Sequence, residues 1–262
     1  MRSSARPSTK SQRCASRRPP RRGASAVIGE PRLHEPECES TQQLLVDRAD
    51  ELPEGAVATT DHQTAGRGRL GRDWEDAPGT SLLLSVLLRP PAERSAPELS
   101  LVAAAATAEA VEIATSLSAQ IKWPNDVMLN RRKVAGILAE MRGEAVVIGI
   151  GVNVNQTAGQ LPAETRTPAG SLRSLTGCEY DRDAVLGSLL ERLEKRYSAW
   201  RTGGLDAVFD EIGSRNFLFA RTIRVGDVSG VGGSIQRDGR LEIVTGHDSH
   251  VLVESGEVEF VR

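Results

Sequence analysis

The sequence is poor in cysteine and has no long hydrophobic run. Its three cysteines, Cys14, Cys38 and Cys178, are odd in number and never follow a C-x-x-C spacing. This distribution argues against a disulfide framework and against a zinc site, and it favours a reducing, cytoplasmic setting. The longest apolar runs, residues 81–88 and 145–154, have the length of strands. A membrane-spanning helix needs ~20 apolar residues, so we expect no membrane partner.

Acidic residues are missing from the first 22 positions, which hold eight Lys or Arg. The remainder carries 25 basic and 35 acidic residues, so a basic tail precedes an acidic body. The tail combines Ser, Pro and Arg without hydrophobic periodicity, and we predict that residues 1–32 are disordered. The tail has no apolar segment typical of a secretory signal. A transit segment, a weak nucleic-acid-binding arm and a start assigned too far upstream remain as interpretations.

The body has room for one large domain and a small one. Ser40 and Gln43 have the spacing of a capping box before a helix at 41–52, and two further helices are predicted at 97–117 and 181–201. Between them, the pattern predicts an α+β fold with a mixed sheet and packed helices. Strands are expected at residues 55–63, 81–89, 120–123, 127–130, 133–141 and 145–154.

The last part of the chain has a different residue pattern. From Thr222 onward, short β-branched runs alternate with glycines, a rhythm typical of a small β-barrel. We therefore predict a catalytic domain at 33–214 and a C-terminal domain at 215–262.

The stretch "TAGRGRLGRDW", residues 64–74, matches the G-x-G-x-x-G pattern of a dinucleotide-binding turn. That pattern needs a following helix whose N-terminus holds the pyrophosphate, whereas here Pro78-Gly79 and a strand follow. We predict instead a mobile anion-binding lid that carries Arg67, Arg69 and Arg72. An arginine-rich solvated turn is the plainer alternative, and a nucleic-acid arm lacks the aromatic residues that base stacking requires.

Two further motifs carry candidate chemistry. "KWPND" and the lysine that follows it at 133 place two cations, an amide and a carboxylate around one strand break, a set suited to a nucleotide triphosphate with Mg²⁺. A surface hairpin with solvated lysines is equally consistent with this sequence. "GIGVNVN", residues 149–155, is weak alone because such glycines often only permit close packing.

In combination, "STQQ", "HQTAGRGRLGRDW", "KWPNDV", "KVAGIL" and "GIGVNVN" closely resemble the biotin protein ligases, from about Ser40 to the C-terminus. The resemblance implies a class II synthetase-like catalytic fold and an SH3-like C-terminal barrel. It also implies ATP-dependent formation of biotinyl-5′-AMP and pyrophosphate, followed by transfer of biotin to a lysine of a biotin carboxyl carrier domain, such as that of acetyl-CoA carboxylase. ATP and Mg²⁺ are the implied cofactors.

The resemblance also assigns roles to individual residues. Lys133, Arg67 and Arg69 are expected to be catalytic, at the carboxylate and the α-phosphate. In the family an Asn usually stands where this chain has Gln42. The residues expected to bind biotin are Ser40, Thr41, Gln42, Gln63, Arg67, Gly68, Arg69, Lys133 and Gly136. Those expected to bind ATP are Arg72, Trp74, which would stack on adenine, Lys122, Asn125, Asp126 and Asn153, with Asn125 and Asp126 also expected to hold Mg²⁺.

Two other functions remain as alternatives. A lipoate or octanoate ligase or transferase shares the catalytic fold, although "KWPND" with "GRGRLGR" favours biotin. Some biotin ligases are also DNA-binding repressors, but only 39 residues precede Ser40 and they show no helix-turn-helix pattern. We therefore expect no specific DNA binding, and a homodimer is possible.

Overall fold

The computed structural model describes residues 27–163, 165–246 and 249–261. Most of the predicted basic tail lies outside the described residues. Residues 27–32 differ from that prediction: Ile28 is buried in the hydrophobic core, and the Gly29 amide donates to the Gly55 carbonyl over 2.9 Å. Within the described part of the chain, every helix is too short or too polar to span a bilayer.

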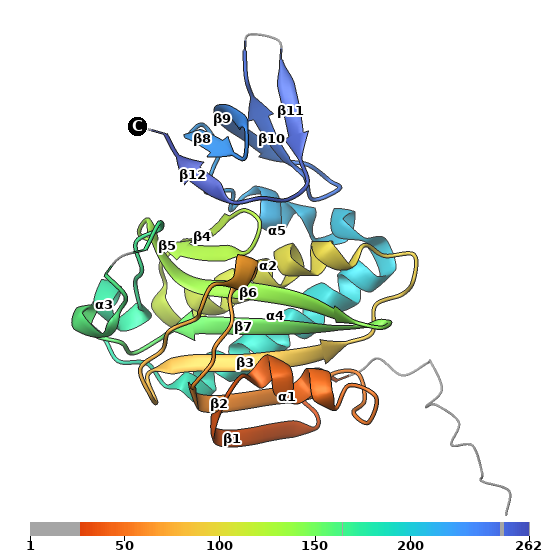
Figure 1. The fold of residues 1–262 in the computed structure, drawn as a ribbon, viewed down its shortest axis with the longest axis vertical. Coiled ribbons are helices and arrows are strands. Elements are labelled where there is room, and N and C mark those ends of the chain that lie inside the picture. The colour runs from red at the N-terminus through yellow and green to blue at the C-terminus, as the bar shows by residue number, and fades with distance from the viewer. Residues whose placement is uncertain (1–26, 164, 247–248, 262) are drawn as a thin grey trace, which may run out of the picture.

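A seven-stranded mixed sheet forms the centre of the larger unit (Figure 1). Its order is β1-β2-β3-β7-β6-β5-β4; β1 runs parallel to β2, and all other neighbours are antiparallel. The strands are β1 (Arg32–Cys38), β2 (Val57–Gln63), β3 (Ser81–Leu88), β4 (Ala119–Lys122), β5 (Asp126–Leu129), β6 (Arg132–Arg142) and β7 (Ala145–Asn153). β1 was not predicted, because its charged sequence lacks an apolar alternation.

Helices cover both faces of this sheet. The long helices α2 (Leu99–Thr115) and α4 (Arg182–Gly203) pack on each other and on one face, as the patterns at 97–117 and 181–201 predicted. The short α1 (Thr41–Asp47) lies on the opposite face. α1 is shorter than predicted, and the predicted capping box is wrong: Ser40 is extended and buried, and its side chain makes no capping hydrogen bond. The short helices are α3 (Leu172–Thr176) and α5 (Phe209–Gly213).

Alternation along the strands separates the two faces. On β3, Leu84 and Val86 belong to the core under α2 and α4, whereas Leu87 packs in the smaller core under α1. Further along the α1 face, Gly149 pairs with Ser85, and Gly151 pairs with Gly136. These glycines carry no side chain onto that face, which leaves room there for the cavity described below.

The C-terminal unit is a five-stranded antiparallel sheet of order β11-β10-β9-β8-β12. Its strands are β8 (Thr222–Val225), β9 (Val228–Ile235), β10 (Leu241–Val244), β11 (His250–Val253) and β12 (Val258–Phe260). β11 and β12 are the two edges, so the strands of the described residues do not close the predicted barrel by pairing. The Trp123 indole donates to the Gly239 carbonyl over 2.9 Å, and the hydrophobic core continues into this unit. The predicted mixed sheet with packed helices and a small C-terminal β-unit is confirmed.

Candidate active site

A cavity on the α1 face of the sheet brings together residues that are far apart in the sequence. Its walls come from the start of α1, the end of β2, the lid and strands β3, β6 and β7. All nine residues that the family resemblance assigned to biotin line it: Ser40, Thr41, Gln42, Gln63, Arg67, Gly68, Arg69, Lys133 and Gly136. Of the six residues assigned to ATP, Trp74 and Asn125 line the same cavity.

The Trp74 indole lies on a floor of two paired glycines. A Cβ atom added to Gly136 would be 3.0 Å from Cζ3 of Trp74, and one added to Gly151 would be 2.6 Å from Cε2. Any larger residue at Gly151 would therefore displace the ring. The indole Nε1 is buried and has no hydrogen-bond partner among the described residues, which leaves a donor for an acceptor in the cavity.

Polar side chains gather where α1 meets β2 and β3. Gln63 Oε1 accepts hydrogen bonds from the Thr41 amide over 2.9 Å and from the Thr41 hydroxyl over 3.2 Å. The Thr41 and Ser85 hydroxyls are 2.8 Å apart. This end of the cavity offers hydroxyl and amide groups that can donate and accept hydrogen bonds, which suits an uncharged polar group of a ligand.

Gln42 stands where the resembling family usually has Asn, and the glycine on β7 explains how it fits. Its Nε2 lies 3.4 Å from the Val147 carbonyl and 3.5 Å from the Leu138 carbonyl. Its Oε1 occupies the space that a Cβ on Gly149 would need. The longer amide is therefore buried in the wall because residue 149 has no side chain.

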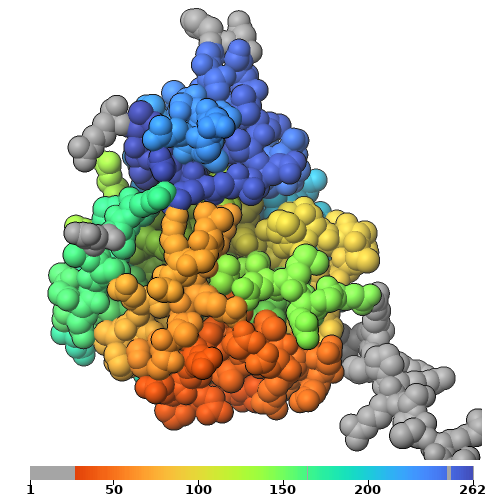
Figure 2. Space-filling view, in the orientation of Figure 1, coloured from red at the N-terminus to blue at the C-terminus, as the bar shows by residue number. Residues whose placement is uncertain are grey.

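The lid is a hairpin-like excursion between β2 and β3. The Gly68 amide donates to the Arg72 carbonyl over 2.7 Å, and the Trp74 amide donates to the Gly66 carbonyl over 2.9 Å. Its tip is a single 3₁₀ turn, η1 (Arg69–Gly71), in which exposed Leu70 has φ 59°. No helix follows, so the exclusion of a dinucleotide-binding turn is confirmed. Figure 2 shows the orange lid segment reaching the blue C-terminal sheet.

Each lid arginine contacts a different part of the molecule. The Arg67 guanidinium donates to Gln43 Oε1 over 3.2 Å and lies 3.4 Å from the Glu140 carboxylate on β6. Arg69 Nη1 donates to Asn125 Oδ1 over 3.1 Å. Burial lowers the pKa of Arg69 from its usual value, although Asp126 opposes this effect. Arg67 and Arg69 thus reach the cavity from the lid.

Arg72 instead faces outward to the C-terminal unit, where it forms an ion pair with Glu257. Glu257 also accepts from Arg166 over 2.6 Å, and Arg166 lies 3.2 Å from Glu259 of β12. Arg72 lines a groove of about 560 Å³ on the outer side of the lid, bounded by α2 and β6. The structure therefore places Arg72 beside the main cavity and not in its wall.

Lys133 lies between the cavity and the "KWPND" segment. Its Nζ is 2.7 Å from Asp126 Oδ1 and 5.7 Å from the Trp74 ring centre. Both polar atoms of the Asn125 side chain have a partner, because Nδ2 donates to the Ile137 carbonyl over 2.8 Å while Oδ1 accepts from Arg69. Of the two predicted metal ligands, Asp126 is therefore the more available, because its carboxylate contacts Lys133 and is not held by an amide or a guanidinium as Asn125 is.

Two predicted ATP residues lie outside the wall of the cavity with their polar atoms in use. Lys122 is buried, donates to the Thr167 hydroxyl over 2.8 Å and lies 5.5 Å from the Phe260 ring centre. Burial lowers its pKa. Asn153 donates to the Gly170 carbonyl over 3.0 Å and accepts from Gln156 over 3.0 Å. Asn153 therefore holds the segment after β7 in place.

The predicted magnesium site has a sparse ligand set. The described residues contain no group of three His, Cys, Asp or Glu side chains that would hold a metal by themselves. Mg²⁺ is commonly bound by one or two carboxylates together with substrate phosphates and water. Asp126 fits such a shared site, whereas Asn125 would first have to release Arg69.

Sequence reasoning missed three residues at the edge of the site: Asp76, Arg166 and Glu257. Asp76 follows the lid motif by two positions, and its side chain is entirely buried. A single aspartate in the sequence does not indicate such burial. Arg166 and Glu257 come from a loop and from the segment before β12. Their approach to Arg72 depends on how the C-terminal unit packs, so no local pattern identifies them.

Comparisons with known proteins agree with this architecture. The model of the Biotin/lipoate A/B protein ligase family matches residues 36–155. "Biotin--[acetyl-CoA-carboxylase] ligase" of Mycobacterium tuberculosis is 34% identical over 220 residues, 80% of each chain. "Bifunctional ligase/repressor BirA" of Bacillus spizizenii is 38% identical over 190 residues, which cover 70% of this chain and 58% of that protein. The aligned part of this chain thus spans somewhat more than half the length of that relative.

A solved structure extends the match to nearly the whole chain. "Biotin protein ligase from Aquifex aeolicus in complex with biotin and ATP" superposes with a TM-score of 0.80 at 29% identity, and the match covers 89% of this chain and 99% of that one. Both the sheet with its helices and the C-terminal unit lie within this coverage. With the identity to the mycobacterial protein over four-fifths of each chain, these findings show that the chain belongs to the biotin protein ligase family.

Proposed function

We propose that the chain is an ATP-dependent biotin protein ligase, which forms biotinyl-5′-AMP and then transfers biotin to a lysine of a carboxyl carrier protein. The observation that carries this proposal is the cavity lined by all nine expected biotin residues. The M. tuberculosis relative is named for a carboxylase acceptor, and the A. aeolicus structure holds biotin and ATP. A carboxylase carrier domain is accordingly the partner that we propose.

In the first step, a biotin carboxylate oxygen attacks the α-phosphorus of ATP, and the bond between that phosphorus and pyrophosphate breaks. The attack brings two anions together, so fixed cations favour both the approach and the transition state. Arg67 and Arg69 reach the cavity from the lid and Lys133 from β6. Lys133 would exchange its contact with Asp126 for the developing charge on the α-phosphate.

The ATP would lie between Trp74 and the C-terminal unit. We propose that the Trp74 ring stacks on adenine and that Arg72 and Lys122 neutralise the polyphosphate. Asp126 would hold Mg²⁺, which supplies charge neutralisation on the leaving pyrophosphate. The hydrogen bonds of Asn125 and Asn153 support indirect roles, through Arg69 and through the loop at Gly170.

In the second step, the neutral amine of the acceptor lysine attacks the acyl carbon of the mixed anhydride. AMP leaves, an amide forms, and the lysine nitrogen releases a proton to solvent. Water attacks the same carbon, so the intermediate survives only where water is excluded. A lid that closes over the cavity would shield it until the carrier arrives.

The test is biotin-dependent exchange of labelled pyrophosphate into ATP, followed by avidin detection after a carrier domain is added. The wild-type chain should exchange with biotin and not with lipoate, a result that separates the two ligase activities. Lys133→Ala should abolish exchange, whereas Lys195→Ala on the exposed face of α4 should retain it. Exchange with lipoate alone, or normal exchange by the Lys133 variant, would contradict the proposal.

A further inference from the structure

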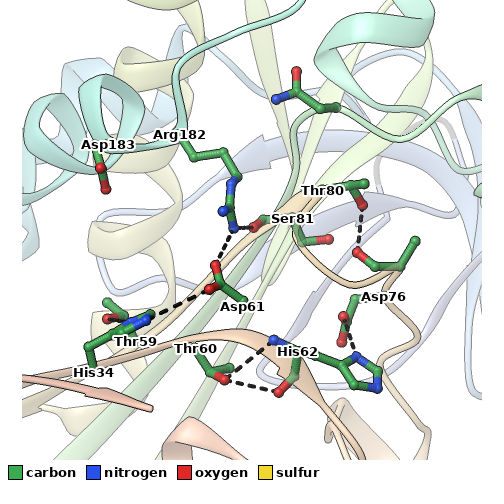
Figure 3. A network of polar contacts seen from close by, with 12 residues as sticks. His34, Thr59, Thr60, Asp61, His62, Asp76, Thr80, Ser81, Arg182 and Asp183 are labelled. Atoms are coloured by element: carbon green, nitrogen blue, oxygen red, sulfur yellow. Dashed lines mark hydrogen bonds and ion pairs between the residues drawn. The ribbon is translucent and has the colours of Figure 1, made fainter. Parts of the chain in front are cut away.

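A fully buried carboxylate lies at the root of the lid. The Asp76 side chain is 0% exposed; its Oδ1 is 2.8 Å from Nδ1 of His62, and its Oδ2 accepts from the Gln63 amide over 3.2 Å. Figure 3 shows the pair of Asp76 and His62 beside the end of β2. A carboxylate is stable at such depth only when its charge is compensated by hydrogen bonds. Asp76 therefore links the segment after the lid to the strand before it.

This link replaces missing main-chain pairing. The two arms of the excursion are joined by the Gly79 amide on the Asp61 carbonyl and by the Trp74 amide on the Gly66 carbonyl, each over 2.9 Å. Between these bonds, no main-chain hydrogen bond joins residues 62–65 to 75–78 in the described residues; Thr64 and Ala65 donate to the end of β1 and to Glu39 instead. The Asp76 carboxylate bridges this gap.

The same contact reaches the cavity through one residue. Asp76 holds the main-chain amide of Gln63, and the Gln63 side chain holds both the amide and the hydroxyl of Thr41. Thr41 in turn contacts Ser85 on the cavity wall. A shift of the Gln63 backbone would thus move the polar end of the cavity, where the urea ring of biotin is expected.

We propose that Asp76 is a positioning residue for biotin: it fixes the backbone of Gln63 and, through the Gln63 side chain, the Thr41 end of the cavity, and so sets the affinity of the cavity for the biotin ring. The inference rests on the proposed ligase function. It predicts a selective change in the KM for biotin, because the contacts of Asp76 lead to Gln63 and Thr41 and not to the triphosphate residues. A purely structural role would lower stability without this selectivity.

The test compares Asp76→Ala with Asp76→Asn in the biotin-dependent pyrophosphate exchange assay. Alanine leaves the buried Gln63 amide without an acceptor, and the KM for biotin should rise at least about fivefold while the KM for ATP stays nearly constant. Asparagine keeps an oxygen for the Gln63 amide and a side-chain amide within reach of His62 Nδ1, so it should restore most of the affinity. Asp61→Ala is the matched control, because Asp61 lies on β2 with Gln63, but its side chain pairs with Arg182 over 2.8 Å and is 41% exposed (Figure 3).

Melting temperature is measured for every variant. If the alanine variant does not fold, Asp76→Ser supplies the same comparison with asparagine, because its hydroxyl is too short for the native contacts. The proposal is overturned if the alanine or serine variant keeps the wild-type KM for biotin, or if both KM values rise together. Exchange-inactive wild-type protein would instead refute the ligase function itself.

Discussion

Gly151 and Gly136 face each other across β6 and β7 and carry the Trp74 ring between them. The absence of a Cβ at these positions makes room for Trp74, because the indole occupies the space that a side chain would take. Gly149 has the same relation to Gln42. Three glycines on adjacent strands therefore decide how deep the cavity is and what covers it.

Gly151→Ala should weaken ATP and biotin binding. The new methyl would lie 2.6 Å from the indole carbons, and overpacking of this kind costs about 1–3 kcal/mol. KM values in pyrophosphate exchange should rise roughly tenfold or more, and the tryptophan fluorescence of the protein should change because Trp74 is displaced. Gly187→Ala on the exposed side of α4, where nothing lies within 4 Å, is the control and should leave both unchanged. Wild-type KM values in the Gly151 variant would show that the ring can move freely.

Lys122 should set an alkaline limit on the ATP binding proposed above. Burial lowers the pKa of its ammonium group, with Lys133 adding to this effect and Asp126 opposing it. The folded state then releases this proton at a lower pH than the unfolded state, so the group adds stability as pH rises between the two pKa values. Loss of ATP affinity in that window would therefore not reflect unfolding through Lys122.

We expect the KM for ATP to rise at a pH below the ordinary lysine range, because the neutral amine no longer attracts the polyphosphate. Lys122→Arg should move this alkaline limb upward, since a guanidinium stays protonated there. Pyrophosphate exchange without a carrier measures the effect and avoids titration of the acceptor lysine. An alkaline limb at the same pH in both proteins would remove Lys122 from the ATP site.

At the scale of elements, the lid closes the cavity more tightly than a ligand permits. The cavity beneath it is about 60 Å³, whereas the groove outside is about 560 Å³, and small-molecule sites usually hold roughly 300–1,000 Å³. Binding of biotin in this cavity, as proposed above, would require the lid and Trp74 to move outward before the site closes again. Exposed Leu70, at φ 59°, forms the tip of the moving segment.

Trypsin should report this movement, because Arg67, Arg69 and Arg72 all lie in the lid. Cleavage there should be fast in the protein alone, where the lid is free to open, and slow with biotin and ATP, whose contacts would hold the lid in place. Arg237 and Arg240, in the turn between β9 and β10, provide an internal control that ligands should not affect. Equal cleavage of the lid with and without ligands would contradict the closing movement.

At the scale of the whole molecule, the C-terminal unit holds the lid. Glu257 binds Arg72 of the lid and Arg166 of the loop after β7, so three segments meet at one carboxylate. Arg72 and Arg166 are about half exposed, and such ion pairs contribute roughly 0–1 kcal/mol to stability. Loss of these ion pairs should therefore change how readily the lid opens more than it changes the free energy of unfolding.

Glu257→Gln should release biotinyl-5′-AMP several-fold faster, because the lid loses its ionic contact with the C-terminal unit. The melting temperature should change by only a few degrees. Release is measured by trapping the free intermediate, or by biotinylation of bystander lysines. Glu242→Gln is the control, since Glu242 pairs with His250 in the same unit over 2.9 Å and does not contact the lid. Unchanged release in the Glu257 variant would show that this ion pair does not link the lid to the C-terminal unit.

Local sequence determined the main elements. The spacing of Leu186, Leu189 and Leu193 was sufficient to predict α4, and the strands around "KWPND" and "GIGVNV" followed from alternating apolar residues and turn residues. These features depend on neighbours three or four positions apart at most. The charged edge strand β1 was not predicted, and the predicted capping bond of Ser40 was wrong. Neither feature is determined by the residues next to it in the sequence.

The family motifs also identified the nine expected biotin residues, Trp74 and Asn125, all of which line the cavity, although not how each one acts. Only the tertiary structure decided that Asn125 and Asn153 are already bound, that Asp76 is buried beneath the lid and that Glu257 reaches Arg72. The physical reason is distance along the chain. Residue types and local spacing fix hydrogen-bonding capacity, whereas the partners of a side chain depend on which distant segments the sheet and the C-terminal unit bring beside it.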